Sequence, residues 1–434
     1  MLKSVLSRGG VFAVADQGVN SLASFLTTVV MARMLGAHDF GTYSLLFVAM
    51  MTLTGLVNTV VSEPIRTLGV NGAPALQSQY VGAQLTLAAC VGMGVASVVV
   101  GGLVLFRAVD IAIALPVGLA VFVAGEFEAL RALAASRHEW QRMFTGDVIA
   151  QLAKLTMLVA LLYEGKISIA SGYWVLAAAG LCGAFVLYLL GAKPVVPDRR
   201  YLLGQVRSHV MYGRWLSLES VVYLLSTQLY IYLIAMLVDV SSAGAFAAAQ
   251  TLINAANIIW MGVTSYSVST ARGILIAQGA QAWRKWLLST GTRLAAFVAV
   301  LVALISLCAQ PLMSLLFTPA YARYAHVVPI LAIAAVLMAI NSLLNVAFRT
   351  LDMPQMGFRG KAVSAVVTSV IAIPLIRELG IVGAALGMIV TQVCWTAVYL
   401  WGLRSIQSSW AARIDGIRTA YRFPGTGLPI TRPS

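Results

Sequence analysis

The stretch VFAVADQGVNSLASFLTTVVMARML, which runs from Val11 to Leu35, is the first of about twelve apolar runs in this 434-residue chain. A helix needs about 20 mainly apolar residues to cross a hydrocarbon core roughly 30 Å thick, so the run is long enough to span a membrane. It exceeds the length of a signal-peptide core, has no small-residue cleavage site and leads directly into a second apolar run. We therefore expect a retained transmembrane helix.

Composition extends this expectation to the whole chain. Apolar residues make up 60% of the sequence and charged residues 10%, whereas a soluble protein of this size needs far more charge to cover its surface. The pattern predicts an all-α polytopic membrane protein of about twelve transmembrane helices, in two six-helix bundles around a central cavity. The predicted spans are 11–35, 41–62, 80–105, 111–132, 144–163, 171–191, 212–238, 244–268, 291–316, 327–348, 360–377 and 381–403.

Four regions follow from these spans. A basic connector, 193–211, separates an N-terminal bundle, 1–192, from a C-terminal bundle, 212–404, and a basic tail, 405–434, ends the chain. With the termini, the connector and the even-numbered loops on one side, that side holds 23 lysines and arginines, against 5 on the other. The positive-inside rule then predicts that both termini are cytoplasmic. Loop placement thus explains the net charge of +14 without a nucleic-acid partner.

The two halves show a weak internal repeat at an offset of 203 residues. The aligned pairs are Gly41 with Gly244, Ser62 with Ser265, and Asp16 with Glu219. Six spans per half place both halves in the same orientation, so a parallel repeat about an axis along the membrane normal is expected. This arrangement is typical of alternating-access transporters with a central cleft.

Polar side chains recur at helical spacing in several spans, which puts them on one face of each helix. They suggest a hydrated cavity between the halves, although ordinary interhelical hydrogen bonds, worth about 0.6 kcal/mol each on average, would give the same pattern. The candidate cavity amides are Asn20, Asn58, Asn254, Asn257, Asn341 and Asn345.

Charged residues inside spans are costly and usually face protein or water. Lys154 stands near the middle of its span, where it either neutralises an acid such as Glu126 or Glu128 or presents a cation to substrate. Glu128 and Arg131 have the i, i+3 spacing of an ion pair. The candidate cavity cations are Arg33, Arg66, Lys154 and Arg272, and the candidate coupling or gating acids are Asp16, Glu219, Glu126 and Glu128.

The predicted position along the span separates Arg66 and Arg272 from Arg33. Arg66 and Arg272 follow their spans at nearly equivalent repeat positions, where they either guard the inner mouth of the cleft or act as positive-inside anchors. Arg33 lies near the outer end of its span, where the orientation rule disfavours a cation. A functional or structural partner is therefore expected for Arg33.

The sequence lacks the motifs of common enzyme chemistry. It has no GxxxxGK[ST] run for nucleotide phosphates and no HExxH pair for zinc. The four histidines are dispersed, and the four cysteines lie inside apolar spans without a CxxC pair, as expected for packing residues. We therefore expect no enzymatic activity, metal site or cofactor, with coupling to protons or sodium left open.

Three passages resemble the O-antigen and exopolysaccharide flippases of the multidrug/oligosaccharidyl-lipid/polysaccharide exporter superfamily. They are MARMLGAHDFGTYSLL (Met31–Leu46), LRALAASRHEWQRMF (Leu130–Phe144) and IPLIRELGIVGAALGMIVTQ (Ile373–Gln392). The resemblance implies a bacterial inner-membrane flippase that moves an undecaprenyl-pyrophosphate-linked oligosaccharide to the periplasmic leaflet. The related drug-exporting branch uses an acid in its first helix as a coupling-ion site, a place that Asp16 occupies in this chain.

Two other functions are compatible with the sequence. A cation-coupled small-molecule exporter would have the same spans and basic loops. A non-transporting membrane subunit that holds a polysaccharide polymerase or glycosyltransferases together would need the basic loops and the tail but not the cavity residues. Membrane lipids are expected partners in every case.

Overall fold

The computed structural model describes residues 8–68, 74–191, 193–351 and 353–405. Helices are the only regular secondary structure in this part of the chain, which confirms the all-α prediction. Helices occupy all twelve predicted ranges, with short interruptions. In chain order the helices are α2 (Arg8–Met34), α3 (Ala37–Val57), the π-helical turn η1 (Asn58–Ser62), α4 (Glu63–Leu68), α5 (Pro74–Leu105), α6 (Ile111–Ser136), α7 (Trp140–Tyr163), α8 (Ile169–Leu189), α9 (Arg199–Thr227), α10 (Leu229–Leu237), α11 (Val240–Gln278), α12 (Ala280–Leu307), α13 (Ala309–Leu312), the π-helical turn η2 (Met313–Phe317), α14 (Pro319–Ala322), α15 (Val327–Thr350) and α16 (Pro354–Ser405).

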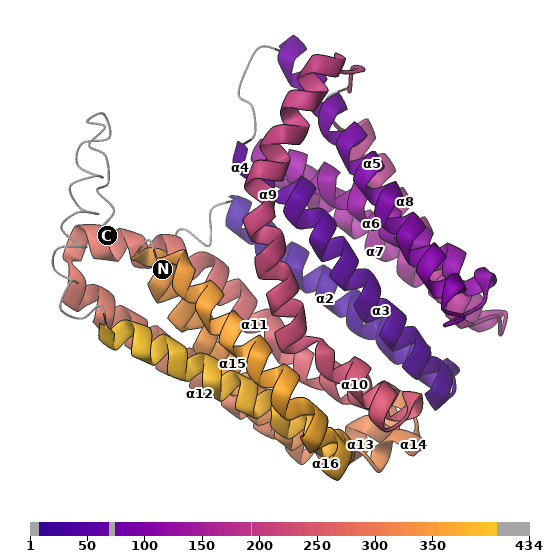
Figure 1. Ribbon diagram of the computed structural model, residues 1–434, viewed down its shortest axis with the longest axis vertical. Coiled ribbons are helices and arrows are strands. Elements are labelled where there is room, and N and C mark those ends of the chain that lie inside the picture. Colours follow the sequence, from indigo (N-terminus) through magenta and orange to yellow (C-terminus); the bar gives the residue numbers. More distant parts are fainter. Residues whose placement is uncertain (1–7, 69–73, 192, 352, 406–434) are drawn as a thin grey trace.

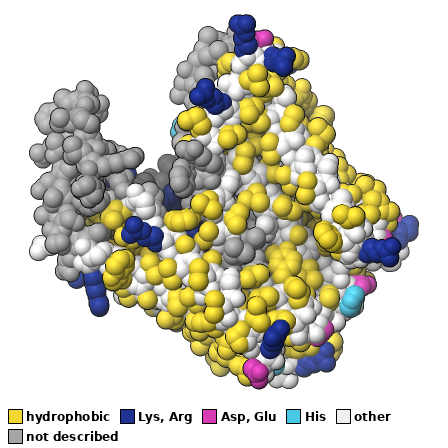
Figure 2. Space-filling view, viewed as in Figure 1, with side chains coloured by type: hydrophobic (Ala, Val, Ile, Leu, Met, Phe, Trp, Pro, Cys, Tyr) yellow, Lys and Arg dark blue, Asp and Glu magenta, His cyan; other side chains and the backbone are white. Residues whose placement is uncertain are grey.

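The outer surface is that of a multi-pass membrane protein. Large apolar side chains such as Val98, Phe185 and Val366 are more than 60% exposed, and Figure 2 shows a broad hydrophobic face with most of its charged side chains near the rims. Eight helical stretches among the described residues are long and apolar enough to cross a membrane: Ala37–Arg66, Gln77–Leu105, Ile111–Ser136, Trp140–Tyr163, Ile169–Leu189, Ala280–Leu307, Val327–Thr350 and Gln355–Ser405.

Local sequence signals fix where several helices begin and end. Ser168 and Ser171 form a reciprocal capping box at the start of α8, and the Asp239 carboxylate accepts a 2.7 Å hydrogen bond from the main-chain N–H of Ser242 at the start of α11. Both contacts satisfy N–H groups that a helix end leaves without partners. Gly380, with φ of 59°, interrupts α16, since a positive φ suits glycine far better than other residues.

The helices gather into two groups that α9 links (Figure 1). In the first group, α6 packs on α5 and α8, and α7 packs on α2 and α8. In the second group, α15 packs on α11, α12 and α16. The two groups touch mainly through α11, which packs on α2 and α3, and through α9, which packs on α16 and on η1. The helix α9, which begins inside the predicted connector 193–211, thus contacts both groups.

The predicted connector is largely the first part of α9, and it docks on the first group. The Val195 N–H donates to the Ser78 carbonyl at 3.1 Å, and Gln84 donates to Gln205 at 3.1 Å. His209 is 1% exposed, and its Nδ1 lies 3.0 Å from the Val60 carbonyl in η1. A π-helical turn shifts the usual pairing of main-chain groups and often marks a functional site, and here α9 contacts that turn directly.

At one end of the molecule the two groups meet at a close helix crossing. A Cβ atom on Gly41 would lie 2.0 Å from the Val240 carbonyl oxygen, and a Cβ atom on Gly244 would lie 2.9 Å from the Gly41 nitrogen. Only glycine permits such an approach. Gly41 and Gly244 are the aligned glycines of the internal repeat, and their mutual contact places the crossing next to the expected symmetry axis. We call this region the closed end.

Aromatic side chains add to the contact at the closed end. The Phe40 and Tyr321 rings meet edge to face at a centroid separation of 6.1 Å, a favoured geometry for aromatic pairs. The Tyr232 hydroxyl donates to the Leu45 carbonyl at 3.2 Å. Away from this end the axes of the two groups diverge (Figure 1).

The close crossing at Gly41 predicts that a single added methyl group there lowers the stability of the protein. Gly41→Ala should push α3 and α11 apart and lower the free energy of unfolding by about 1–3 kcal/mol, the usual cost of overpacking, seen as a lower thermal unfolding midpoint in detergent. Gly55→Ala, in the same helix but with nothing within 4 Å of the added Cβ, is the matched control and should be neutral or stabilising because alanine favours helices. Equal midpoints for both variants would contradict the crossing.

His209 predicts a pH dependence of stability. Burial lowers the pKa of His209, partly opposed by the hydrogen bond to Val60, so the folded state binds a proton less readily than the unfolded state. The contribution of His209 is therefore full above the ordinary pKa of about 6.5 and is lost as the pH falls below that value. The unfolding midpoint should fall between pH 8 and pH 5, and less so in His209→Gln. His326→Gln, at an exposed histidine, should keep the wild-type dependence.

Candidate functional site

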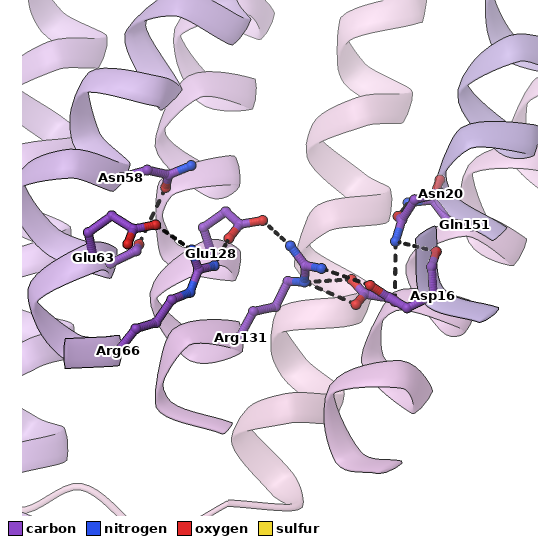
Figure 3. A network of polar contacts seen from close by, with 10 residues as sticks. Asp16, Asn20, Asn58, Glu63, Arg66, Glu128, Arg131 and Gln151 are labelled. Carbon is purple, nitrogen blue, oxygen red and sulfur yellow. Dashed lines mark hydrogen bonds and ion pairs between the residues drawn. The ribbon is translucent and has the colours of Figure 1, made fainter. Parts of the chain in front are cut away.

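A partly buried ionic network crosses the first helix group, centred on Arg131 of α6 (Figure 3). The Arg131 guanidinium donates to Asp16 of α2 at 3.1 Å and to Asp147 of α7 at 2.9 Å. It also pairs with Glu128, one turn earlier in α6, which confirms the predicted i, i+3 pair. Asp147 is only 1% exposed and Asp16 6%. One guanidinium thus ties three helices together by charge-assisted hydrogen bonds, which are stronger than neutral ones.

The network continues toward α4. Arg66 donates to Glu63 at 2.8 Å and to Glu128 at 3.0 Å, so Glu128 is shared between two arginines. Because Glu63 and Arg66 follow η1 directly, this branch reaches the π-helical turn that α9 contacts. Asn58, in η1, accepts a hydrogen bond from Ser62 at 3.3 Å. We call the six ionisable residues the charge cluster: Asp16, Glu63, Arg66, Glu128, Arg131 and Asp147.

Amides extend the network along α2 and α7. Asn20 donates to the Asp16 carboxylate at 3.2 Å and to its main-chain carbonyl at 3.0 Å. Gln151 in turn donates to Asn20 at 2.6 Å. The pairs Asp16–Asn20 and Asp147–Gln151 are each spaced i, i+4, so the two helices present matching polar faces to each other.

The cluster has more acids than bases. Four carboxylates face two guanidinium groups, so full ionisation leaves two negative charges without a cation. Unpaired charge is costly at the buried end of the cluster, around Asp16 and Asp147, whereas the side chains of Glu63 and Arg66 are 39% and 35% exposed. The arrangement therefore suits the uptake of protons or of a small cation among its carboxylate and amide oxygens.

Two further predicted site residues are buried without ionic partners. Lys154, also in α7, is 7% exposed, and the described residues form no ion pair with it. The predicted neutralisation by Glu126 or Glu128 is therefore not observed. Glu126 Oε1 is buried in α6 and has no hydrogen-bond partner within the described ranges.

The remaining predicted residues lie apart from the cluster. Arg33 is exposed in the last turn of α2, and no described acid pairs with it, so its expected partner is absent from this part of the chain; its place at a helix C-terminus still favours a cation. Arg272 is half-buried in α11. Asn341 donates to Gln392 and accepts from Thr396, and Asn345 is half-buried on the same helix. The side chains of Glu219 and Asn257 fall outside the described set.

A cavity of about 680 Å³ lies between the two helix groups. Its described lining comes from α2 and α3 on one side and from α10, α11, α15 and α16 on the other, with Thr227 and Gln228 at the junction of α9 and α10. None of these lining residues is charged. Asn254 is the predicted amide that reaches the cavity. The lining residues that carry polar groups are Ser21, Ser24, Thr28, Tyr43, Ser44, Thr227, Gln228, Gln250, Thr251, Asn254 and Gln392.

Sequence reasoning missed three members of the network. Two of them, Asp147 and Gln151, have the spacing i, i+4 in span 144–163, and the predicted Lys154 follows at i+7. The same rule selected polar stripes in other spans, so this face was open to prediction. Glu63 carried no such signal, because it follows a span and its role depends on contact with Arg66.

The fold is similar to that of several solved structures described as transporters. The chain is similar to an inward-facing multidrug resistance MATE family transporter of the MOP superfamily, with a TM-score of 0.74 and 13% identity over 92% of this chain and 96% of that one. It is also similar to an outward-facing transporter of the same description, with a TM-score of 0.65 and 14% identity over 94% and 95% of the two chains. A MOP superfamily transporter from Pyrococcus furiosus gives a TM-score of 0.66 and 12% identity, again over 94% and 95%.

Comparison by sequence gives no match. No family model matches the chain, and no curated protein matches it. At these identities the likeness shows the fold alone. Of the two MATE conformations, the inward-facing one has the higher TM-score.

The charge cluster predicts a large cost for removing Arg131. Arg131→Gln leaves four carboxylates with one guanidinium, and breaking a buried pair costs about 3–5 kcal/mol, so the thermal unfolding midpoint should fall sharply. Adding Asp147→Asn should restore part of the loss, as expected for residues in direct contact.

Lys166→Gln is the matched control for this experiment. Lys166 pairs with Glu164 at 2.9 Å, but both side chains are exposed, and pairs of this kind contribute little to stability. A midpoint for Arg131→Gln equal to that of Lys166→Gln would contradict a structural role for the cluster.

Proposed function

We propose that this protein is a twelve-helix flippase that moves an undecaprenyl-pyrophosphate-linked oligosaccharide from the cytoplasmic to the periplasmic leaflet of a bacterial inner membrane. The observation that carries the proposal is the cavity of about 680 Å³ between two helix groups in a fold shared with MOP superfamily transporters. The resemblance of Met31–Leu46, Leu130–Phe144 and Ile373–Gln392 to polysaccharide flippases supports the choice of cargo.

The physical problem for such cargo is its polar head. Moving one ion from water into a medium like hydrocarbon costs on the order of 20 kcal/mol in the idealised limit, while the lipid tail loses nothing by staying in the bilayer. A cavity between two bundles gives the head group a path, and rocking of the bundles about the Gly41–Gly244 crossing would open it to alternate sides. In this proposal the closed end faces the periplasm and both termini are cytoplasmic.

The charge cluster is the proposed coupling element. It lies within the first helix group and not in the cavity lining, so an ion bound there acts on the packing of α2, α6 and α7 and not on the cargo directly. Two bound protons, or cations of the same total charge, would neutralise its excess of carboxylates. A change in this packing reaches η1 through Arg66 and Glu63, and from η1 it reaches α9 through His209.

A cation-coupled small-molecule exporter is the second candidate. The specific observation in its favour is that the structures with the same fold include multidrug resistance transporters. Ion-dependent efflux of a cationic dye from cells, with no loss of surface polysaccharide on deletion of the gene, would favour this candidate.

The test uses purified protein in liposomes that contain a polyprenyl-pyrophosphate-linked oligosaccharide, with movement between leaflets measured by lectin access. We expect Asp16→Asn to insert normally but to lower the flipping rate at least tenfold, because it removes one acid of the cluster. Asp110→Asn, at an exposed acid with no side-chain capping bond, is the matched control and should flip at the wild-type rate. Protein-independent movement of the lipid, or an unchanged rate in Asp16→Asn, would count against the proposal.

A further inference from the structure

We infer that the cavity between the helix groups is a binding site for the uncharged, hydroxyl-rich part of the cargo, which we call the neutral seat, and that it discriminates against charged sugars. This inference rests on the proposed function and names the substrate class of its cavity. It starts from the separation of charge in the molecule. Asp16, Glu63, Arg66, Glu128, Arg131 and Asp147 pair with one another in the charge cluster, while the described cavity lining has no charged side chain.

The polar groups that face the cavity are of the kinds that bind hydroxyls. Side-chain amides offer both donors and acceptors, and hydroxyls can do either, so such a lining matches sugar hydroxyls, which also do both. Gln250 and Asn254 come from α11, while Ser24 and Thr28 come from α2. Both halves therefore contribute to the seat, as a site at the centre of an alternating-access transporter requires.

Gln228 is the most distinctive of these groups. It stands at the interruption between α9 and α10, in the middle of a predicted span, and lines the cavity. Its amide makes no hydrogen bond to any described residue. Helices that break near the middle of the membrane commonly form substrate sites in transporters, so the position and the spare amide point to the same use.

Apolar side chains complete the seat. Phe25 and Phe47 lie on one side of the cavity, and Met338 and Met388 lie on the other. The Gln250 amide touches the Met388 sulfur at 3.6 Å, so polar and apolar groups alternate closely. A sugar ring has C–H faces as well as hydroxyl edges, and a pocket with a mainly apolar wall and a few placed polar groups is the usual form of a small-molecule site.

The same lining works against charged cargo. A carboxylate on a sugar, or the ammonium group of a drug, would enter without a counter-ion among the described lining residues, and unpaired charge away from water is strongly unfavourable. The pyrophosphate must therefore lie outside this seat, toward the lipid. Discrimination between neutral and acidic sugars follows from the absence of charged side chains among the described residues that line the cavity.

The experiment compares two probes in the liposome assay. One is a polyprenyl-pyrophosphate-linked trisaccharide of neutral hexoses, and the other is the same molecule with a terminal glucuronate. We expect the wild type to flip the neutral probe at least tenfold faster. Gln250→Lys places a cation in the wall and should reduce or reverse that ratio, and Asn254→Lys provides a second position if the first variant does not fold. Gln141→Lys, at an exposed residue of α7, is the matched control and should keep the wild-type ratio.

The possible outcomes separate this inference from the proposed function. Equal rates for the two probes in the wild type would overturn the neutral seat and leave the flippase proposal standing. A wild-type preference that persists in both lysine variants would also overturn it, since the selection would then come from elsewhere. Failure to flip either probe would overturn the flippase proposal and the seat with it.

Discussion

The burial of Arg131 among carboxylates is the interaction on which the first helix group depends. A guanidinium within an apolar bundle is tolerable only if its donors are satisfied by opposite charge, and its partners here come from α2, α6 and α7. Lipid tails are as apolar as leucine side chains. Apolar packing therefore does not by itself determine how each membrane helix is rotated about its axis relative to its neighbours. The ionic contacts fix which faces of these helices meet, and the amide pair Asn20 and Gln151 extends the same register.

That register also connects distant parts of the molecule. Glu128 joins Arg131 to Arg66, and Arg66 belongs to the short helix that follows η1. On the other side of η1, His209 of α9 contacts Val60, and α9 packs on α16 in the second group. The chain of contacts thus runs from a buried acid cluster to the other half of the molecule. The glycine crossing at Gly41 and Gly244 is a second close contact between the halves, and under the proposed function it is the point about which they move.

Much of the helical fold was predictable, because a run of about 20 apolar residues has few alternatives to a helix in a membrane. The i, i+3 spacing of Glu128 and Arg131 likewise predicted their contact. Other features depend on packing between distant segments, which local periodicity does not encode. The interruption at Gln228, the docking of 193–211 on α5 and η1, and the failure of Lys154 to meet an acid belong to this class. The paired glycines were visible as a repeat, but their mutual contact required the structure.

The separation between the charge cluster and the cavity carries a mechanistic consequence. In a transporter whose cargo and coupling ion compete for the same charged groups, binding of one directly displaces the other. Here the described acids lie away from the cavity wall, so any coupling must act through a change in helix packing, and its strength is limited by the difference in ion affinity between the two conformations. Under the proposed function, a neutral cargo site and a charged coupling site could then change independently of each other.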